Sequence, residues 1–101
     1  MTLHIVSCNP QPGSGFDTAC QLAQKTDALL LVGNGVYSLL PNHTSHAQLL
    51  AINCPIYALM DDLNARGVPE AATGSQMIHY VDYQEWVNLA ALHPQNVSWF
   101  D

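Results

Sequence analysis

The chain has 101 residues and a mass of 11.0 kDa, which predicts a single domain over residues 1–101. It carries 2 basic and 8 acidic residues, so its formal net charge is −6. With only Lys25 and Arg66 available to neutralise phosphates, direct binding to nucleic acid or to an anionic membrane surface is disfavoured. No apolar run approaches the roughly 18 residues of a membrane span, and the first residues lack the pattern of a signal peptide. We therefore expect a cytoplasmic location.

Charged residues make up only 10% of the chain, where about 25% is usual. Neutral side chains supply the polarity instead: 7 Asn, 7 Gln, 6 Ser and 5 Thr. Because the cores of protein interfaces are depleted of charge, this composition indicates a surface that faces other subunits. A monomer wetted by amides and hydroxyls remains an alternative that composition leaves open.

The first third of the chain predicts a strand, a helix and a second strand. Leu3–Ser7 is a short apolar run that only His4 interrupts, and a loop rich in Pro and Gly follows it. Asp17 is a candidate N-cap for a helix that ends near Lys25. Ala28–Val32 is continuously apolar, as in a strand that is buried on both faces.

The middle of the chain predicts three helical segments around a third strand. Val36–Leu40 resembles a short helix, and His46–Ile52 could add another turn or two. Pro55–Met60 is strand-like. A helix follows, with Asp61 and Asp62 in its first turn, Arg66 in its last and Gly67 at its left-handed stop.

The last third predicts a fourth and a fifth strand around one more helix. Met77–Tyr80 and Val97–Phe100 have strand character, and Asp82-x-x-Glu85 resembles a capping box before an amphipathic helix. Alternating strands and helices predict a three-layer α/β fold, a mostly parallel sheet of about five strands with helices on both faces.

Ligand sites in such a sheet gather at the carboxyl ends of its strands. Gly13-Ser14-Gly15 lies where a phosphate loop would lie, but Thr18 replaces a third glycine and the P-loop lysine is missing, so a turn explains the segment better. Asp61 follows a strand as in a phospho-receiver, yet helix initiation explains it. His43 and His46 share helical spacing without a third metal ligand. We expect neither a metal nor a cofactor.

Thiol chemistry is the remaining possibility at this edge. The three cysteines are Cys8, Cys20 and Cys54, an odd number without C-x-x-C spacing, which argues against a disulfide framework. With Asp17 as N-cap, Cys20 would lie in the first turn of its helix, where the dipole favours a thiolate. Asp17 opposes a negative charge on Cys20, and the apolar stripe of the helix could simply bury the side chain. On these features alone, burial is the favoured interpretation. Cys8 lies at a strand end, and Cys54 lies at the opposite edge as a structural residue.

Short segments in a fixed order run through nearly the whole chain: Leu3–Val6, Asp27–Leu31, Gly35–Tyr37, Ile56–Leu59, Asp62–Gly67, Val81–Val87, His93 and Ser98–Trp99. Together these segments resemble the TusB/DsrH family. Single matches are weak, but their order and spacing agree throughout. Thr26, where a glycine is common, and the Cys8–Gly15 loop depart from the family pattern.

The resemblance implies a DsrE-type fold and a subunit of a sulfur-relay complex. Such a complex would be a heterohexamer with TusC/DsrF-like and TusD/DsrE-like subunits, two copies of each, and would pass persulfide sulfur toward 2-thiolation of a tRNA wobble uridine. A DsrH-type role in sulfur oxidation is one alternative, and a stand-alone module that binds small anions or nucleotides through Gly13–Gly15 is another. Some DsrH-type relatives carry a cysteine where Cys20 stands, so Cys20 is a candidate persulfide carrier. An accessory role without chemistry remains the alternative.

Overall fold

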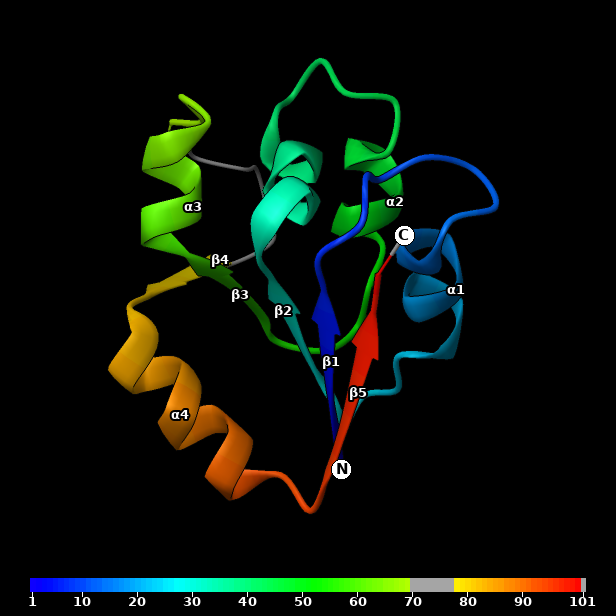
Figure 1. Cartoon of the computed structure of the whole chain (residues 1–101). Coiled ribbons are helices and arrows are strands. Elements are labelled where there is room, and N and C mark those ends of the chain that lie inside the picture. Colours follow the sequence, from blue (N-terminus) through cyan, green and yellow to red (C-terminus); the bar gives the residue numbers. More distant parts are fainter. Residues whose placement is uncertain (70–77, 101) are drawn as a thin grey trace.

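A computed structural model describes residues 1–69 and 78–100. Its strands form one sheet, in which every neighbouring pair is parallel and the order is β4-β3-β2-β1-β5 (Figure 1). This confirms the predicted parallel α/β sheet. The strands are β1 (Thr2–Val6), β2 (Ala28–Leu31), β3 (Ile56–Leu59), β4 (Ile78–Val81) and β5 (Gln95–Trp99).

Helical segments connect consecutive strands along the chain. Four of them are α-helices, and η1 is a 3-10 helix in the connection from β2 to β3. The segments are α1 (Gly15–Leu22), η1 (Gly33–Leu39), α2 (His46–Leu50), α3 (Met60–Ala65) and α4 (Tyr83–Leu92).

The helices cover the two faces of the sheet unequally. Side chains alternate between faces along each strand, so Leu29 and Leu31 point to one face and Leu30 points to the other. The first face, here called the front face, packs against α1, η1, α2 and α3. Among the residues that the structure describes, the second face, the back face, packs against α4. Right-handed crossovers explain this, because the chain steps from β1 to β4 in one direction and returns across the sheet to β5.

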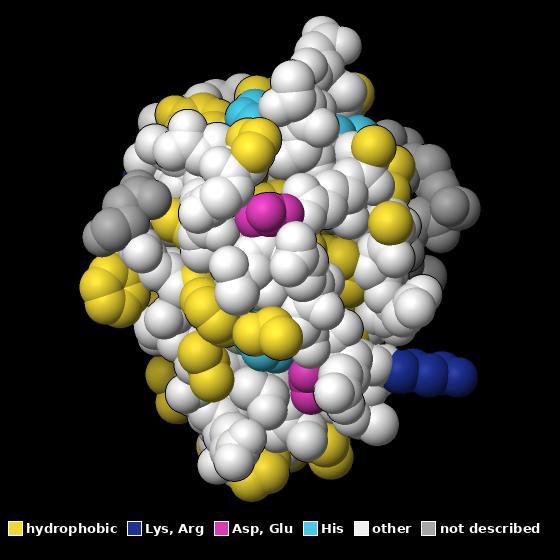
Figure 2. Space-filling model, turned by 90° about the vertical axis from the view of Figure 1, so that its right-hand side faces the viewer, with side chains coloured by type: hydrophobic (Ala, Val, Ile, Leu, Met, Phe, Trp, Pro, Cys, Tyr) yellow, Lys and Arg dark blue, Asp and Glu magenta, His cyan; other side chains and the backbone are white. Residues whose placement is uncertain are grey.

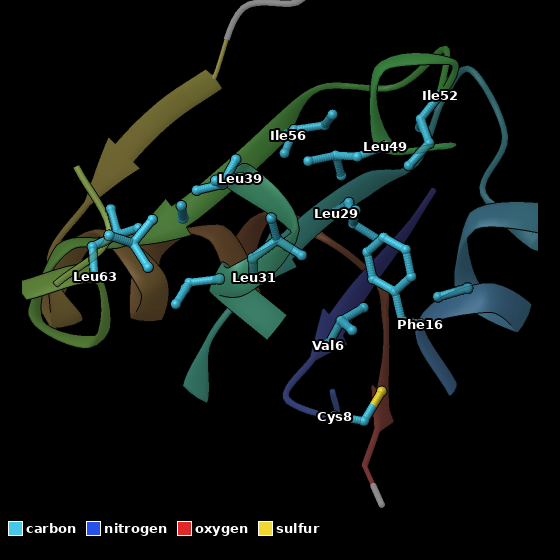
Figure 3. Packing of buried hydrophobic residues seen from close by; sticks show 14 of the residues in the cluster. Val6, Cys8, Phe16, Leu29, Leu31, Leu39, Leu49, Ile52, Ile56 and Leu63 are labelled. Atoms are coloured by element: carbon cyan, nitrogen blue, oxygen red, sulfur yellow. The ribbon is translucent and has the colours of Figure 1, made fainter. Parts of the chain in front are cut away.

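The front face carries the larger core. Phe16 from α1 is fully buried above the sheet, and the other helical segments add Leu39, Leu49 and Leu63 (Figure 3). η1 lies so close to β1 that a Cβ added to Gly35 would collide with the carbonyl oxygen of Val6. This close contact explains the glycine at that position.

Several predicted boundaries need correction. The helix predicted from Asp17 to near Lys25 begins at Gly15, with Ser14 as N-cap, and ends at Leu22. The segment predicted as Val36–Leu40 begins three residues earlier, because Gly33–Gly35 form the first turn of the 3-10 helix and not a separate turn.

The end of the chain follows the prediction more closely. The Asp82–Glu85 capping box is confirmed, with both reciprocal hydrogen bonds present. The last strand is Gln95–Trp99 and not Val97–Phe100. Met77, expected to begin the fourth strand, lies outside the described residues. Within residues 1–69 and 78–100, no helix combines the length and the apolar character that crossing a bilayer requires.

Candidate functional site

Cys20 lies on α1, on the front side of the sheet, but not in the first turn as predicted. Since α1 spans Gly15–Leu22, Cys20 is in its last turn. The predicted N-cap, Asp17, is the third helical residue, and its carboxylate accepts hydrogen bonds from Gln48 Nε2 at 2.6 Å and from the Gly13 amide at 3.3 Å. The dipole at the carboxyl end of a helix disfavours a negative charge, so the argument for a dipole-stabilised thiolate is wrong.

The surroundings of Cys20 favour the neutral thiol. Its side chain is partly buried and packs against the front-face core. Burial, followed by the charge of Asp17 and then by the neighbouring Cys54 and Cys8, raises the pKa of the Cys20 thiol to about 12. In the isolated chain Cys20 is therefore a protonated thiol at neutral pH.

Cys8 and Cys54 are both buried, with 1% and 2% of their surface exposed. Cys8 follows β1 and lies beside Gly15, where an added Cβ would be 3.3 Å from its Sγ and 3.1 Å from the Cβ of Trp99. Cys54 precedes β3, and burial together with the charge of Asp27 raises its pKa to about 11. Both side chains thus belong to the core, as the sequence predicted for Cys54.

A buried polar network that the sequence did not reveal joins β1, β5 and the connection before β2. Trp99 Nε1 donates to His4 Nδ1 at 3.1 Å, which leaves the His4 Nε2 proton to be donated to Asp27 Oδ2 at 3.2 Å. Asp27 also accepts from the amides of Thr2 and Gln24, at 2.9 and 3.0 Å. Burial opposes ionisation of Asp27, but these amide bonds and His4 together hold its pKa below the usual range. The one signal for this network was His4, the polar interruption of an apolar strand.

At the carboxyl edge, Asp62 holds the end of β2 to α3. Its Oδ2 accepts from the Gly33 amide at 2.7 Å, and its Oδ1 is 3.4 Å from Arg66 Nη1. Arg66 Nε donates in turn to Asn34 Oδ1 at 3.0 Å. Asp61 is exposed beside it in the first turn of α3, as predicted for a helix-start residue.

The two histidines with helical spacing have separate partners. His43 Nδ1 accepts from the Ser45 amide at 3.1 Å, whereas His46 Nδ1 bonds the Ser38 carbonyl oxygen at 2.9 Å. Among residues 1–69 and 78–100, no three His, Cys, Asp or Glu side chains are arranged to hold a metal ion.

The Gly13–Gly15 segment is held in part by a hydrogen bond to the carboxylate of Asp17. Ser14 Oγ donates to the Gln11 carbonyl oxygen at 2.7 Å, and the Gly13 amide donates to Asp17. An anion at this point would compete with Asp17 for the amide and be repelled by its charge. The geometry therefore gives no support to a phosphate loop.

The side of the molecule that carries α1 and β5 is poor in charge. Figure 2 shows neutral polar and hydrophobic side chains over most of this side, with few acidic or basic groups between them. A surface of this kind matches the interface character that the composition indicated.

Comparison with known proteins decides the family. A family model described as "DsrH like protein" matches residues 10–96. The chain belongs to the DsrH/TusB family. Protein TusB of Pectobacterium carotovorum subsp. carotovorum (strain PC1) is 36% identical over 96% of this chain and 99% of its own. Protein TusB of Serratia proteamaculans (strain 568) is 40% identical over 78% of this chain and 81% of its own.

Solved structures agree with the DsrH/TusB assignment at the level of the fold. The crystal structure of the ychN protein from E. coli superposes with a TM-score of 0.73, covering 97% of this chain and 98% of the other at 14% identity. The solution structure of protein Tm0979 from Thermotoga maritima gives 0.63 at 24% identity, covering 90% and 92%. The DsrH/TusB chain thus has a fold that proteins of quite different sequence share.

Proposed function

We propose that this chain is a subunit of a cytoplasmic sulfur relay. The family match over residues 10–96, together with 36% identity to a TusB protein over almost the whole chain, carries the proposal. The net charge of −6 supports a role in which another subunit contacts tRNA, because this chain has little with which to neutralise phosphates.

The partners would be TusC/DsrF-like and TusD/DsrE-like subunits in a heterohexamer with two copies of each. The low charge of the chain and the exposed apolar side chains of α4 support a subunit that is covered in its assembly. The relatives named TusB favour 2-thiolation of a tRNA wobble uridine as the destination of the sulfur. A DsrH-type role in sulfur oxidation is the second candidate, which the family model favours by its description.

Within that relay, Cys20 is the proposed acceptor of persulfide sulfur on this chain. Its thiolate would attack the outer sulfur of a donor persulfide, R–S–SH. The donor S–S bond breaks and a new S–S bond forms at Cys20, so that Cys20–SH and R–S–SH become Cys20–S–SH and R–SH. No oxidant is needed. Because burial raises the pKa of Cys20 to about 12 in this chain, we expect a partner to supply the base that removes the proton.

Co-expression with the two partner types tests the assembly. The expected result is co-elution of all three chains in gel filtration as one complex. A well-folded chain that elutes as a monomer in their presence would contradict the proposal.

Persulfide loading tests Cys20. After incubation with a persulfide donor, intact mass and peptide mapping should locate an added 32 Da on Cys20 in the complex and little in the isolated chain, with Cys20→Ser as the matched control. Labelling confined to Cys8 would overturn the role of Cys20 and move the chemistry to Cys8, and no labelling of this chain in the complex would leave the subunit without chemistry of its own.

Alkylation tests the state of the thiol. The isolated chain should react with iodoacetamide at Cys20 at least about tenfold more slowly at pH 7.5 than a thiol of pKa 9 does, and the rate should keep rising above pH 9. Peptide mass spectrometry over a pH series measures this. A plateau near pH 8 would show that the thiol is already activated in the isolated chain.

A further inference from the structure

The back face of the sheet holds a pocket that the residues of the sulfur chemistry do not touch. It lies between α4 and the strands β3 and β4 and has a volume of about 200 Å³. Most of its wall is hydrocarbon. The lining residues are Tyr57, Val81, Glu85, Asn88, Leu89 and Leu92.

The walls of this pocket suit an elongated apolar stem. Leu89 is buried against the sheet, whereas Leu92 is 72% exposed and forms part of the open rim. Tyr57 presents its ring, which is stacked on the ring of His79 with centroids 5.2 Å apart. In the isolated chain Leu92 gains little from burial, because most of its side chain is in contact with water. A partner that covered Leu92 would bury this apolar surface and be stabilised by doing so.

The polar part of the pocket is acidic. Glu85 is the lining residue with a charge, and its Oε1 accepts from the Asp82 amide at 3.1 Å as part of the capping box. A carboxylate has further acceptor capacity on its second oxygen. Asn88 Oδ1 already accepts from Gln84 Nε2 at 3.3 Å. The pocket therefore combines hydrocarbon walls, an aromatic ring and one carboxylate, which together match a cation on a long aliphatic stem.

We infer that this pocket receives a lysine or arginine side chain from a partner subunit of the relay, an inference that rests on the proposed function. A second copy of this chain is a poor donor. Arg66 is engaged by Asp62 and Asn34, so only the exposed Lys25 is left to offer, and each copy carries a net charge of −6. Two copies with this net charge would repel one another as they approached. A sister subunit with a basic side chain at its interface fits where a second copy does not.

Charge variants of Glu85 test the pocket in the assembled protein. Glu85→Gln keeps the capping box, because glutamine serves at that position, and removes only the charge. Glu85→Lys reverses the charge. We expect the Kd for the two partner subunits to rise about tenfold with Glu85→Gln and a hundredfold or more with Glu85→Lys. Leu92→Ala, which shortens the wall, should raise the Kd severalfold.

Matched controls come from α3. Asp61 is also an exposed carboxylate in the first turn of its helix, so Asp61→Asn and Asp61→Lys repeat the charge changes away from the pocket. Both should leave the Kd within about twofold of that of the unmodified chain, a size of effect typical of exposed charges. Circular dichroism and the midpoint of thermal unfolding show whether each variant is folded.

The outcomes separate the pocket from the proposed function. If the unmodified chain binds its partners and the Glu85 variants bind equally well, the pocket inference is wrong and the relay subunit stands. If the unmodified chain binds neither partner, both fail. If the isolated chain dimerises and Glu85→Lys abolishes the dimer, the occupant is a second copy and the inference is overturned. A partner Lys→Glu or Arg→Glu change that restores binding to Glu85→Lys would identify the inserted side chain.

Discussion

The two faces of the sheet differ in how completely the chain covers them. Four helical segments cover the front face, and Phe16, Leu39, Leu49 and Leu63 are buried there to 2% exposure or less. On the back face, α4 buries Leu89 but leaves Val87 61% and Leu92 72% exposed. The front face holds the larger core, and the helix on the back face carries apolar side chains that this chain leaves exposed.

This difference follows from topology. Three consecutive crossovers place their helices on the front, and the single return from β4 to β5 places one ten-residue helix across the back. The back-face strand residues Leu3, Leu30 and Leu59 are nevertheless fully buried, so the apolar surface that stays exposed on this side belongs to α4 itself, at Val87 and Leu92. Charged side chains could have masked that surface, but the chain has few of them.

Among the substitutions considered, one on the front face should change the free energy of unfolding most. Phe16→Ala removes a fully buried ring and should lower the free energy of unfolding by about 3–5 kcal/mol. Urea unfolding followed by circular dichroism measures it. A loss below about 1 kcal/mol would show that the front core is not the main source of stability.

The next effect concerns the buried network at the margin of the front face. Asp27→Asn cannot accept all the hydrogen bonds that the carboxylate accepts, and should cost about 2–3 kcal/mol at pH 7. The folded pKa of Asp27 lies below its unfolded value of 3.8, so its stabilisation is present above that pH and is lost as the pH falls through the folded pKa. Urea unfolding at pH 7 and pH 3 should therefore show a smaller difference between variant and unmodified chain at pH 3. An equal difference at both values would contradict the role of the charge.

A matched truncation on the back face should have a smaller effect. Leu89→Ala removes a side chain that is 8% exposed and adjoins the open pocket, so we expect a loss of about 2 kcal/mol, near the low end for buried leucines. The same urea titration compares it directly with Phe16→Ala. A larger loss than for Phe16→Ala would reverse the ranking of the two faces.

The smallest effect is expected on the outer side of α4. Val87→Asn changes an exposed side chain and should alter the free energy of unfolding of the isolated chain by less than about 0.5 kcal/mol. A loss above 1 kcal/mol, measured in parallel with Leu89→Ala, would show that the back face is already covered, for example by self-association.

The strands were predictable because they carry their own signal. The continuous apolar run at Ala28–Leu31 is what a central parallel strand requires, and the Asp82–Glu85 capping box is a local pattern that begins α4. Such features depend on neighbouring residues and little on the rest of the fold.

The start of α1 and the buried network depend on residues far apart in the chain. Aspartate is a good N-cap, so Asp17 was the local choice, yet Gly15 packs against Trp99 and the helix begins there. His4, Asp27 and Trp99 meet only once β1 pairs with β5 and the connection before β2 is in place. The helix predicted from Asp17 begins too late in the chain, and this error places Cys20 in the first turn when it lies in the last.

The pairing of β1 with β5 has a consequence for biosynthesis. β1 lies inside the sheet, but its partner on one side is more than 90 residues later in the chain, as in the register of Thr2 with Gln95. Until that segment has been translated, the nascent β1 presents an unpaired edge and His4 lacks the indole of Trp99. Completion of the sheet is thus a late event in synthesis, and until then the unpaired edge is a place where another chain could pair.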